Sequence, residues 1–305
     1  MSASSADAQA AGSKRQASDT SEQIKVAVEG AAASFVLRVW PASDPAAPVL
    51  LIVPAMAVKA KFYRAVAAAL NARGLSAATV DLRAQGESEP GVRESAGFGY
   101  REMIEQDLPA ITGAVRERFP QAPLVLFGHS LGGQLALLFA AASPAQAAAV
   151  IVIGTDSVYW RSFGLRPGIR VLLMVQYIGL VSRLRGYWPG SKAMGGPMAG
   201  RVMTDWARHS RTGRYRPRGA TRDYDRLLGE LPLPVLMISL DDDPLGPAPT
   251  IDWLAARLTS ARVDRQHLGA AEGMRNPGHF AWVRDAELLS ARLTDWTRQA
   301  TAPAD

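Results

Sequence analysis

The sequence contains no cysteine among its 305 residues. This absence excludes disulfide bonds, catalysis by a thiolate, and zinc or iron–sulfur sites built on cysteine. It is compatible with a reducing compartment, and we expect a cytoplasmic protein. Residues 1–22 are rich in Ser, Ala, Gln and Asp and lack the apolar stretch of a secretory signal. We therefore expect disordered tails over residues 1–22 and 300–305.

Long apolar runs are scarce as well. The longest lipid-like run, residues 171–181, is too short to cross a bilayer and contains Gln and Gly, so we expect no membrane span. Residues 155–230 hold thirteen arginines and one lysine against four aspartates and one glutamate. Such a basic segment can attract an anionic substrate or an acidic membrane surface, although we favour arginines on a solvated helical surface. The sequence contains no recognised nucleic-acid-binding motif, so we do not expect the protein to bind nucleic acid.

Apolar strand-like segments alternate with helix-like segments along most of the chain. Strands are expected over residues 24–28, 34–39, 49–53, 76–81, 123–127, 150–153, 234–240 and 262–267, and helices over 59–73, 100–119, 134–141, 250–257 and 280–299. This alternation predicts an α/β fold with a mostly parallel sheet covered by helices on both faces. It stops between residues 155 and 230. We therefore expect a core formed by residues 23–154 and 231–299, with an inserted, mainly helical cap over 155–230.

The most informative segment is an apolar strand that runs into a Gly-x-Ser-x-Gly motif. The motif is Gly128-His129-Ser130-Leu131-Gly132, and a helix-forming stretch follows it. This arrangement predicts a nucleophile elbow, a tight turn that exposes a serine hydroxyl. Gly128 and Gly132 are needed because Cβ atoms at these positions would collide with neighbouring backbone. An ordinary glycine-rich loop is the simpler alternative, but a dinucleotide-binding loop would require G-x-G-x-x-G, which is absent.

A nucleophilic Ser130 needs a base to accept its proton. The chain has four histidines. We favour His279, because it lies in a loop just before the last expected helix and can reach across the carboxyl edge of the sheet. His267 is the alternative, although its place at the end of a strand favours a structural role. His129 should point away from Ser130, and His209 lies in the cap.

The base in turn needs a carboxylate that orients it and stabilises its charged form. Asp241, Asp242 and Asp243 directly follow the strand that ends at residue 240. We favour Asp243, with Asp242 second, and Asp156 is a rival because it follows the preceding strand. At least one aspartate of the triplet should belong to a solvated turn.

Two further sets of residues are candidates for binding the substrate. An oxyanion would need two donors, and we expect the backbone N–H groups of Leu131 and Met56. The cap also carries aromatic side chains that could line an apolar acyl pocket or form the core of the cap itself. These candidates are Tyr159, Trp160, Tyr177 and Trp188.

Three segments together resemble the α/β-hydrolase superfamily, in particular bacterial hydrolases of the serine aminopeptidase and monoacylglycerol-lipase branch. They are the elbow, the run from Asp81 to Ser88, and Gly278-His279-Phe280. The resemblance covers about residues 24–298 and implies the chain order Ser130, Asp243, His279 for a triad. Two residues depart from the pattern: Pro54 stands where His is usual, and Ala84 where Gly is usual. We interpret Arg83 and Ser88, in the loop beside the site, as structural.

These observations lead to one main hypothesis and two alternatives. The main hypothesis is hydrolysis of an acyl compound, a carboxylic ester above all, through a Ser-His-Asp triad and an acyl-enzyme. The substrate would be a small molecule, anionic or lipid-like, and no metal or organic cofactor is implied. An acyltransferase, thioesterase or peptidase could use the same triad. A ligand-binding protein without catalytic activity on the same fold is the alternative from another class.

Overall fold

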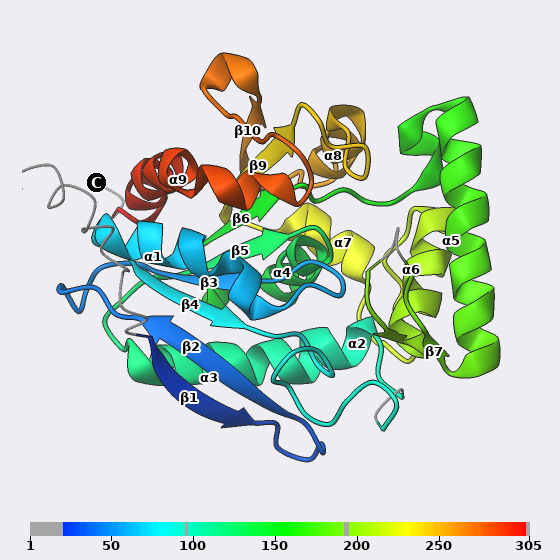
Figure 1. The fold of residues 1–305 in the computed structure, drawn as a ribbon, viewed down its shortest axis with the longest axis horizontal. Helices are drawn as coiled ribbons and strands as arrows, with labels where there is room; N and C mark the ends of the chain where they lie inside the picture. Colours follow the sequence, from blue (N-terminus) through cyan, green and yellow to red (C-terminus); the bar gives the residue numbers. More distant parts are fainter. Residues whose placement is uncertain (1–20, 95–96, 192–194, 303–305) are drawn as a thin grey trace, which may run out of the picture.

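The computed structural model describes residues 21–94, 97–191 and 195–302. Its central element is a sheet with the strand order β1-β2-β4-β3-β5-β6-β9-β10 (Figure 1). The strands are β1 (Glu22–Ala27), β2 (Ser34–Trp40), β3 (Val49–Val53), β4 (Ser76–Val80), β5 (Leu124–His129), β6 (Ala149–Ile153), β9 (Pro234–Leu240) and β10 (Arg262–Leu268). β2 pairs antiparallel with β1 and β4, and all pairings from β4 to β10 are parallel. The mostly parallel sheet predicted from the sequence is confirmed.

The sheet is buried on both faces, which explains the continuous apolar runs of its central strands. In β3, Leu50 and Ile52 join one hydrophobic core, while Val49, Leu51 and Val53 join the other. Helices α1 (Arg64–Ala72) and α9 (Ala286–Thr301) cover one face, and α3 (Leu108–Arg118) and α4 (Leu131–Ala142) cover the other (Figure 1). Another helix of the core, α8 (Ala248–Ala255), follows β9.

Several boundaries differ from the expectations. β1 already begins at Glu22, and α9 continues to Thr301, so both expected disordered tails are shorter than predicted. Residues 1–20 and 303–305 lie outside the described part of the chain. The helix expected over 100–119 is divided into α2 (Tyr100–Glu102), a π-helical turn (Met103–Asp107) and α3. Pro109 has no N–H to donate to the carbonyl of residue 105, which favours the wider turn at this point.

Residues 155–230, called the cap below, lie between β6 and β9, and their described part, 155–191 and 195–230, adds no strand to the main sheet. They form α5 (Leu165–Arg185), α6 (Gly200–Thr212), α7 (Tyr224–Glu230) and a small ribbon of β7 (Tyr187–Trp188) and β8 (Met198–Ala199). α5 and α6 pack closely: a Cβ atom on Gly179 would lie only 2.6 Å from the Cβ of Ala207. α5 forms the outer edge of the molecule, away from the sheet (Figure 1).

Candidate active site

Ser130 occupies the turn between β5 and α4 with a φ of 52°, in the left-handed region. This conformation is strained for a residue with a Cβ atom, and the surrounding packing holds Ser130 in it. A Cβ atom on Gly128 would lie 2.3 Å from Cα of Gly133, and one on Gly132 would lie 2.1 Å from the carbonyl oxygen of Val53. The collisions predicted for these two glycines are therefore confirmed. Gly133, which the sequence did not single out, is equally constrained, because its Cβ would lie 2.1 Å from Oγ1 of Thr155.

His279 lies beside Asp243, and both side chains are buried. Nδ1 of His279 is 2.8 Å from Oδ2 and 2.9 Å from Oδ1 of Asp243. The backbone N–H groups of Leu245 and Gly246 donate to Oδ1 of the same carboxylate, at 2.9 and 2.8 Å. These donors hold the carboxylate in place. The pair thus has the geometry in which a carboxylate fixes the orientation of an imidazole.

The three consecutive aspartates have separate surroundings. Asp241 is exposed, and its Oδ1 lies 2.8 Å from Nε2 of His267, whose Nδ1 is 2.7 Å from Oγ of Ser239. The side chain of Asp242 is exposed, and its backbone N–H donates to the carbonyl of Pro277. His267 therefore belongs to a surface contact at the end of β10, whereas Asp243 is the member of the triplet that contacts His279.

His129 is buried under the elbow, and its two ring nitrogens meet Tyr63 and Trp282. Its Nδ1 lies 2.8 Å from the hydroxyl of Tyr63, and Nε1–H of Trp282 donates to its Nε2 over 3.4 Å. Burial holds the pKa of His129 well below its usual value, and the nearby His279 adds to this effect. His129 is therefore a neutral packing residue, and Tyr63 and Trp282 are site residues that sequence reasoning missed.

Ser130 and His279 line one cavity of about 270 Å³. Leu131 and Met56, the expected oxyanion donors, line it as well. Leu131 is the first residue of α4, so its N–H has no acceptor within the helix. The positive end of the helix dipole is therefore directed toward the place where an oxyanion would form.

Backbone strain is concentrated around this cavity. In the described part of the chain, four non-glycine residues have a positive φ, and three of them, Ala57, Ser130 and Val158, line the cavity. Strained backbone of this kind persists where the surrounding structure enforces it, and it gathers at functional sites. The fourth residue is Ala84, at the position where the resembling family has glycine.

The comparisons with known proteins concern the fold. Residues 44–185 match the model of the family described as serine aminopeptidase, S33. A carboxyl esterase from Bacillus coagulans aligns with a TM-score of 0.65 at 15% identity, over 92% of this chain and 99% of that one. The chain has the α/β-hydrolase fold. This confirms the resemblance inferred from the sequence at the level of fold.

Two further esterase structures align over similar lengths. Est1E from Butyrivibrio proteoclasticus, solved with ferulic acid, has a TM-score of 0.63 at 13% identity and covers 92% of this chain and 100% of its own. A thermophilic esterase from Thermogutta terrifontis has a TM-score of 0.60 at 18% identity, with coverage of 92% and 100%. None of the curated proteins compared with the chain matches it.

The wall of the cavity differs from the one expected. None of the four aromatic candidates of the cap is among its lining residues. Trp188 is buried in the core, Trp160 begins a 3-10 turn, and Tyr177 is exposed on α5. The cap side of the cavity is formed instead by Val158, Phe163, Val171, Met174, Val175 and Trp206.

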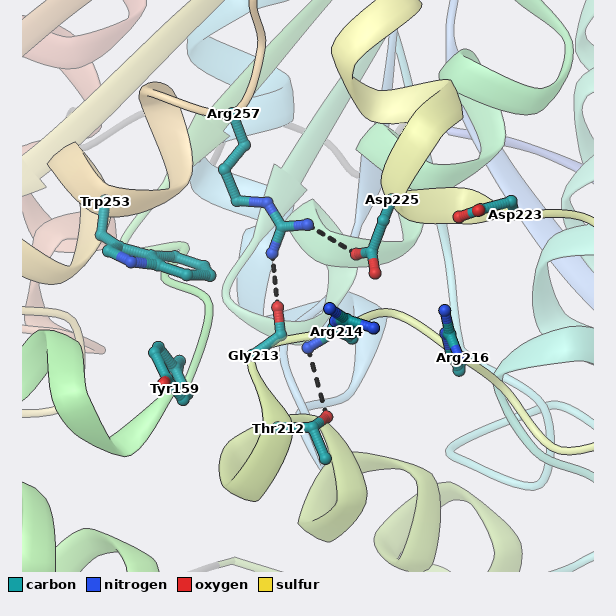
Figure 2. Close-up of a pocket in the computed structure, with 9 residues that line it drawn as sticks. All are labelled: Tyr159, Thr212, Gly213, Arg214, Arg216, Asp223, Asp225, Trp253 and Arg257. Carbon is teal, nitrogen blue, oxygen red and sulfur yellow. Dashed lines mark hydrogen bonds and ion pairs between the residues drawn. The ribbon is translucent and has the colours of Figure 1, made fainter.

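Tyr159, the fourth aromatic candidate, faces a different hollow of about 510 Å³, shown in Figure 2. There its ring packs against Trp253 with the centroids 5.1 Å apart. Arg257 donates to the carbonyl of Gly213 and to Oδ1 of Asp225, the latter over 2.6 Å (Figure 2). Two of the five charged residues that line this hollow, Arg257 and Asp225, thus form an ion pair, and Ser130 is not among its lining residues.

Asp156, the rival acid, does line the cavity of Ser130. It is buried, and its Oδ2 has no hydrogen-bond partner within the described residues. Burial raises the pKa of Asp156 to about 7, and the negative charge of Asp243 contributes in the same direction. Nδ1 of His279 bonds to Asp243, so the structure gives Asp156 a place in the wall of the cavity and leaves the contact with the imidazole to Asp243.

The loop after β4 is held by hydrogen bonds of its own polar side chains. The carboxylate of Asp81 accepts the N–H groups of Ala60 and Glu87, at 2.7 and 2.9 Å. Oγ of Ser88 donates to the carbonyl of Asp81, and Nε of Arg83 donates to the buried carboxylate of Asp107. These contacts agree with the structural roles expected for Arg83 and Ser88. Across residues 21–94, 97–191 and 195–302, no group of three or more His, Asp or Glu side chains is placed to hold a metal ion.

Proposed function

We propose that this α/β-hydrolase is a serine hydrolase that cleaves a carboxylic ester through an acyl-enzyme. The observation that carries the proposal is the buried contact of 2.8 Å between Nδ1 of His279 and Asp243, at a cavity that Ser130 also lines. Elbow geometry supports it, because Ser130 follows a buried strand and directly precedes α4. The matched family and the esterase neighbours support hydrolase chemistry in general.

In the first half of the reaction, Oγ of Ser130 attacks the ester carbonyl. Nε2 of His279 accepts the hydroxyl proton, and the carboxylate of Asp243 stabilises the imidazolium that forms. The N–H groups of Leu131 and Met56 hold the oxyanion of the tetrahedral intermediate. When the intermediate collapses, His279 returns the proton to the leaving alcohol, and the acyl group remains on Ser130.

In the second half, water takes the place of the alcohol. His279 removes a proton from the water as the oxygen attacks the acyl carbonyl, and a second tetrahedral intermediate forms. Its collapse breaks the bond to Oγ, which recovers its proton from the imidazolium. The products are a carboxylic acid and the free enzyme, so the net reaction consumes one water molecule for each ester.

The wall of the cavity indicates which part of the substrate it holds. Val158, Phe163, Val171, Met174 and Val175 present apolar side chains from the cap, and Leu245 and Phe280 add apolar side chains from the core. An apolar acyl group gains free energy by leaving water for such a surface. We therefore assign the acyl chain to the cap side of the cavity.

The experiment that tests this proposal is labelling with a fluorophosphonate. The purified full-length protein should acquire one adduct, located by mass spectrometry at Ser130. The Ser130→Ala variant should not label, and a control Ser157→Ala variant, altered at a buried serine that does not line the cavity, should label normally. Labelling of the Ser130→Ala variant at the wild-type rate would overturn the assignment of the nucleophile.

A second candidate function, removal of an amino-terminal residue from a peptide, is favoured by one observation. Asp156 places a carboxyl with a free oxygen in the wall of the cavity, where it could accept a hydrogen bond from a substrate amine. The description of the matched family points the same way. Turnover of aminoacyl p-nitroanilides well above that of p-nitrophenyl esters would favour the peptidase over the esterase.

A further inference from the structure

Helix α5 turns its large apolar side chains away from the protein. The described part of the chain has nine exposed large hydrophobic side chains, and seven of them lie on this helix. They are Leu165, Ile169, Leu173, Met174, Tyr177, Leu180 and Leu184. Their spacing of three or four residues puts most of them on one face. Leu165 is 72% exposed and Leu184 is 77% exposed, so the face extends over the full length of the helix.

The opposite face of α5 is buried and carries several small residues, and it packs the helix against the rest of the cap. Gly168, Val175, Gly179 and Ser182 are among its buried residues. Nε2 of Gln176 also donates to the carbonyl of Ala207 on α6 over 2.7 Å. By length and composition α5 is the single described helix that could cross a membrane. These contacts with α6 instead leave one face of the helix free and hold it as part of the cap.

The charges around the exposed face have one sign. Arg166 and Arg170 lie near one end of α5 and Arg183 and Arg185 near the other, all exposed, and the helix contains no Asp or Glu. Two copies of this face brought together would place arginines opposite arginines in either orientation. A surface with anionic groups and an apolar interior complements it better, and that combination describes a lipid bilayer with anionic headgroups.

The exposed apolar surface also reaches the cavity of Ser130. The two large exposed hydrophobic side chains outside α5 are Leu245 and Phe280, and both line that cavity. Met174 belongs to both sets, because it is exposed on α5 and lines the cavity. Apolar surface of this extent is rare on soluble monomers unless it binds something.

We propose that the exposed face of α5 docks the cap onto an anionic lipid membrane, with the helix lying in the plane of the interface. The leucines enter the boundary between headgroups and acyl chains, and the four arginines lie against the anionic headgroups. Docking in this way needs no chemistry at Ser130. It brings the mouth of the cavity close to the lipid surface, from which acyl substrates can be drawn.

Co-sedimentation with vesicles tests the proposal. The full-length protein should bind vesicles of phosphatidylcholine mixed with phosphatidylglycerol and bind vesicles of pure phosphatidylcholine far less. Combining Leu165→Gln, Leu173→Gln, Leu180→Gln and Leu184→Gln should lower binding to the anionic vesicles about tenfold or more, because glutamine keeps helix propensity but loses the apolar contact. Replacing the four arginines by glutamine should also lower binding to the anionic vesicles.

Two controls separate docking from folding and from catalysis. None of the four leucines lines the cavity, so the leucine variant should keep its melting temperature and its turnover of a soluble p-nitrophenyl ester. Ser130→Ala should bind vesicles like the wild type, so a failure of the proposed chemistry would leave this result unchanged. Equal vesicle binding by the wild type and the leucine variant would overturn the proposal. The proposal would also be overturned if the wild-type protein bound neither kind of vesicle and eluted as a dimer that the leucine substitutions dissociate.

Discussion

The hydroxyl of Tyr63 lies 2.8 Å from Nδ1 of His129 and also accepts the backbone N–H of Ala55 over 2.9 Å. His129 precedes Ser130, and Ala55 precedes Met56. One buried phenol therefore joins the elbow to the loop expected to supply the second oxyanion donor. Burial raises the pKa of Tyr63 well above its usual value, so the phenol stays protonated at all physiological pH values. The connection is a neutral one that does not change with pH.

Replacing Tyr63 by phenylalanine should lower turnover without removing any reacting group. The Tyr63→Phe variant loses both hydrogen bonds, and the loop around Met56 is then free to shift. We expect kcat to fall about tenfold with KM little changed, since the loss concerns the transition state. Steady-state kinetics on a p-nitrophenyl ester measures this. Tyr177→Phe, on the exposed face of α5, is the matched control and should match the wild type; an unchanged kcat in Tyr63→Phe would show that the network has no positioning role.

The three consecutive aspartates should differ sharply when each is changed to asparagine. Asp243→Asn should lower kcat by about 10³-fold or more, because an amide cannot stabilise the imidazolium of His279. Asp242→Asn and Asp241→Asn should change kcat less than about threefold, since both side chains are exposed. The decrease in kcat caused by Asp156→Asn should lie between these two values. If kcat falls further in Asp156→Asn than in Asp243→Asn, the orienting carboxylate is Asp156.

Asp156 should make the stability of the protein depend on pH. Its pKa is raised from 3.8 to about 7 in the folded state, so between these values the folded chain holds more protons than the unfolded one. The free energy of unfolding should therefore fall as the pH rises from about 4 to 7, by up to about 4 kcal/mol. Asp156→Asn should flatten that decline, as followed by urea denaturation at several pH values. Asp242→Asn is the control, and parallel curves for the wild type and Asp156→Asn would contradict the expectation.

The size of the cavity predicts a preference for acyl chains of medium length. A volume of about 270 Å³ has room for about nine heavy atoms of an acyl chain with their hydrogens, at roughly 30 Å³ each. Turnover of p-nitrophenyl esters should rise from acetate to about octanoate and fall for much longer chains. Val171→Phe, in the wall of the cavity, should move the optimum to shorter chains, whereas Leu172→Phe, outside it, should not. An optimum at acetate for the wild type would contradict the assignment of the acyl chain to this cavity.

Much of the fold could be predicted because the sheet is buried on both faces. Strands such as β3 and β6 are continuous apolar runs, and their order along the chain alternates with helices, which requires parallel pairing. The elbow could be predicted because its glycines are dictated by backbone collisions within a few residues. The approach of His279 to Asp243 followed from their positions after β9 and before the last helix. Local sequence carries all of this information.

The wall of the cavity could not be predicted, because α5 is apolar around most of its circumference. The usual rule buries the larger apolar residues. Here the buried positions include Gly168, Gly179 and Ser182, since α6 approaches closely, and Leu173 and Leu184 remain outside. Tyr63 was missed for a different reason: its partner His129 is far away in the sequence, and a tyrosine before a helix gives no sign of what its hydroxyl will meet.

The chain enters and leaves the cap at neighbouring strands. Ile153, at the end of β6, is the register partner of Ile238 in β9, and such strands lie about 4.8 Å apart. A different insertion could therefore replace residues 155–230 without moving any strand of the sheet, and Ser130, Asp243 and His279 would all remain on the part that stays. The lining of the cavity on the cap side can in this way be exchanged while the rest of the site stays in place, by recombination at two junctions in the gene, one on each side of the cap, or by grafting in the laboratory.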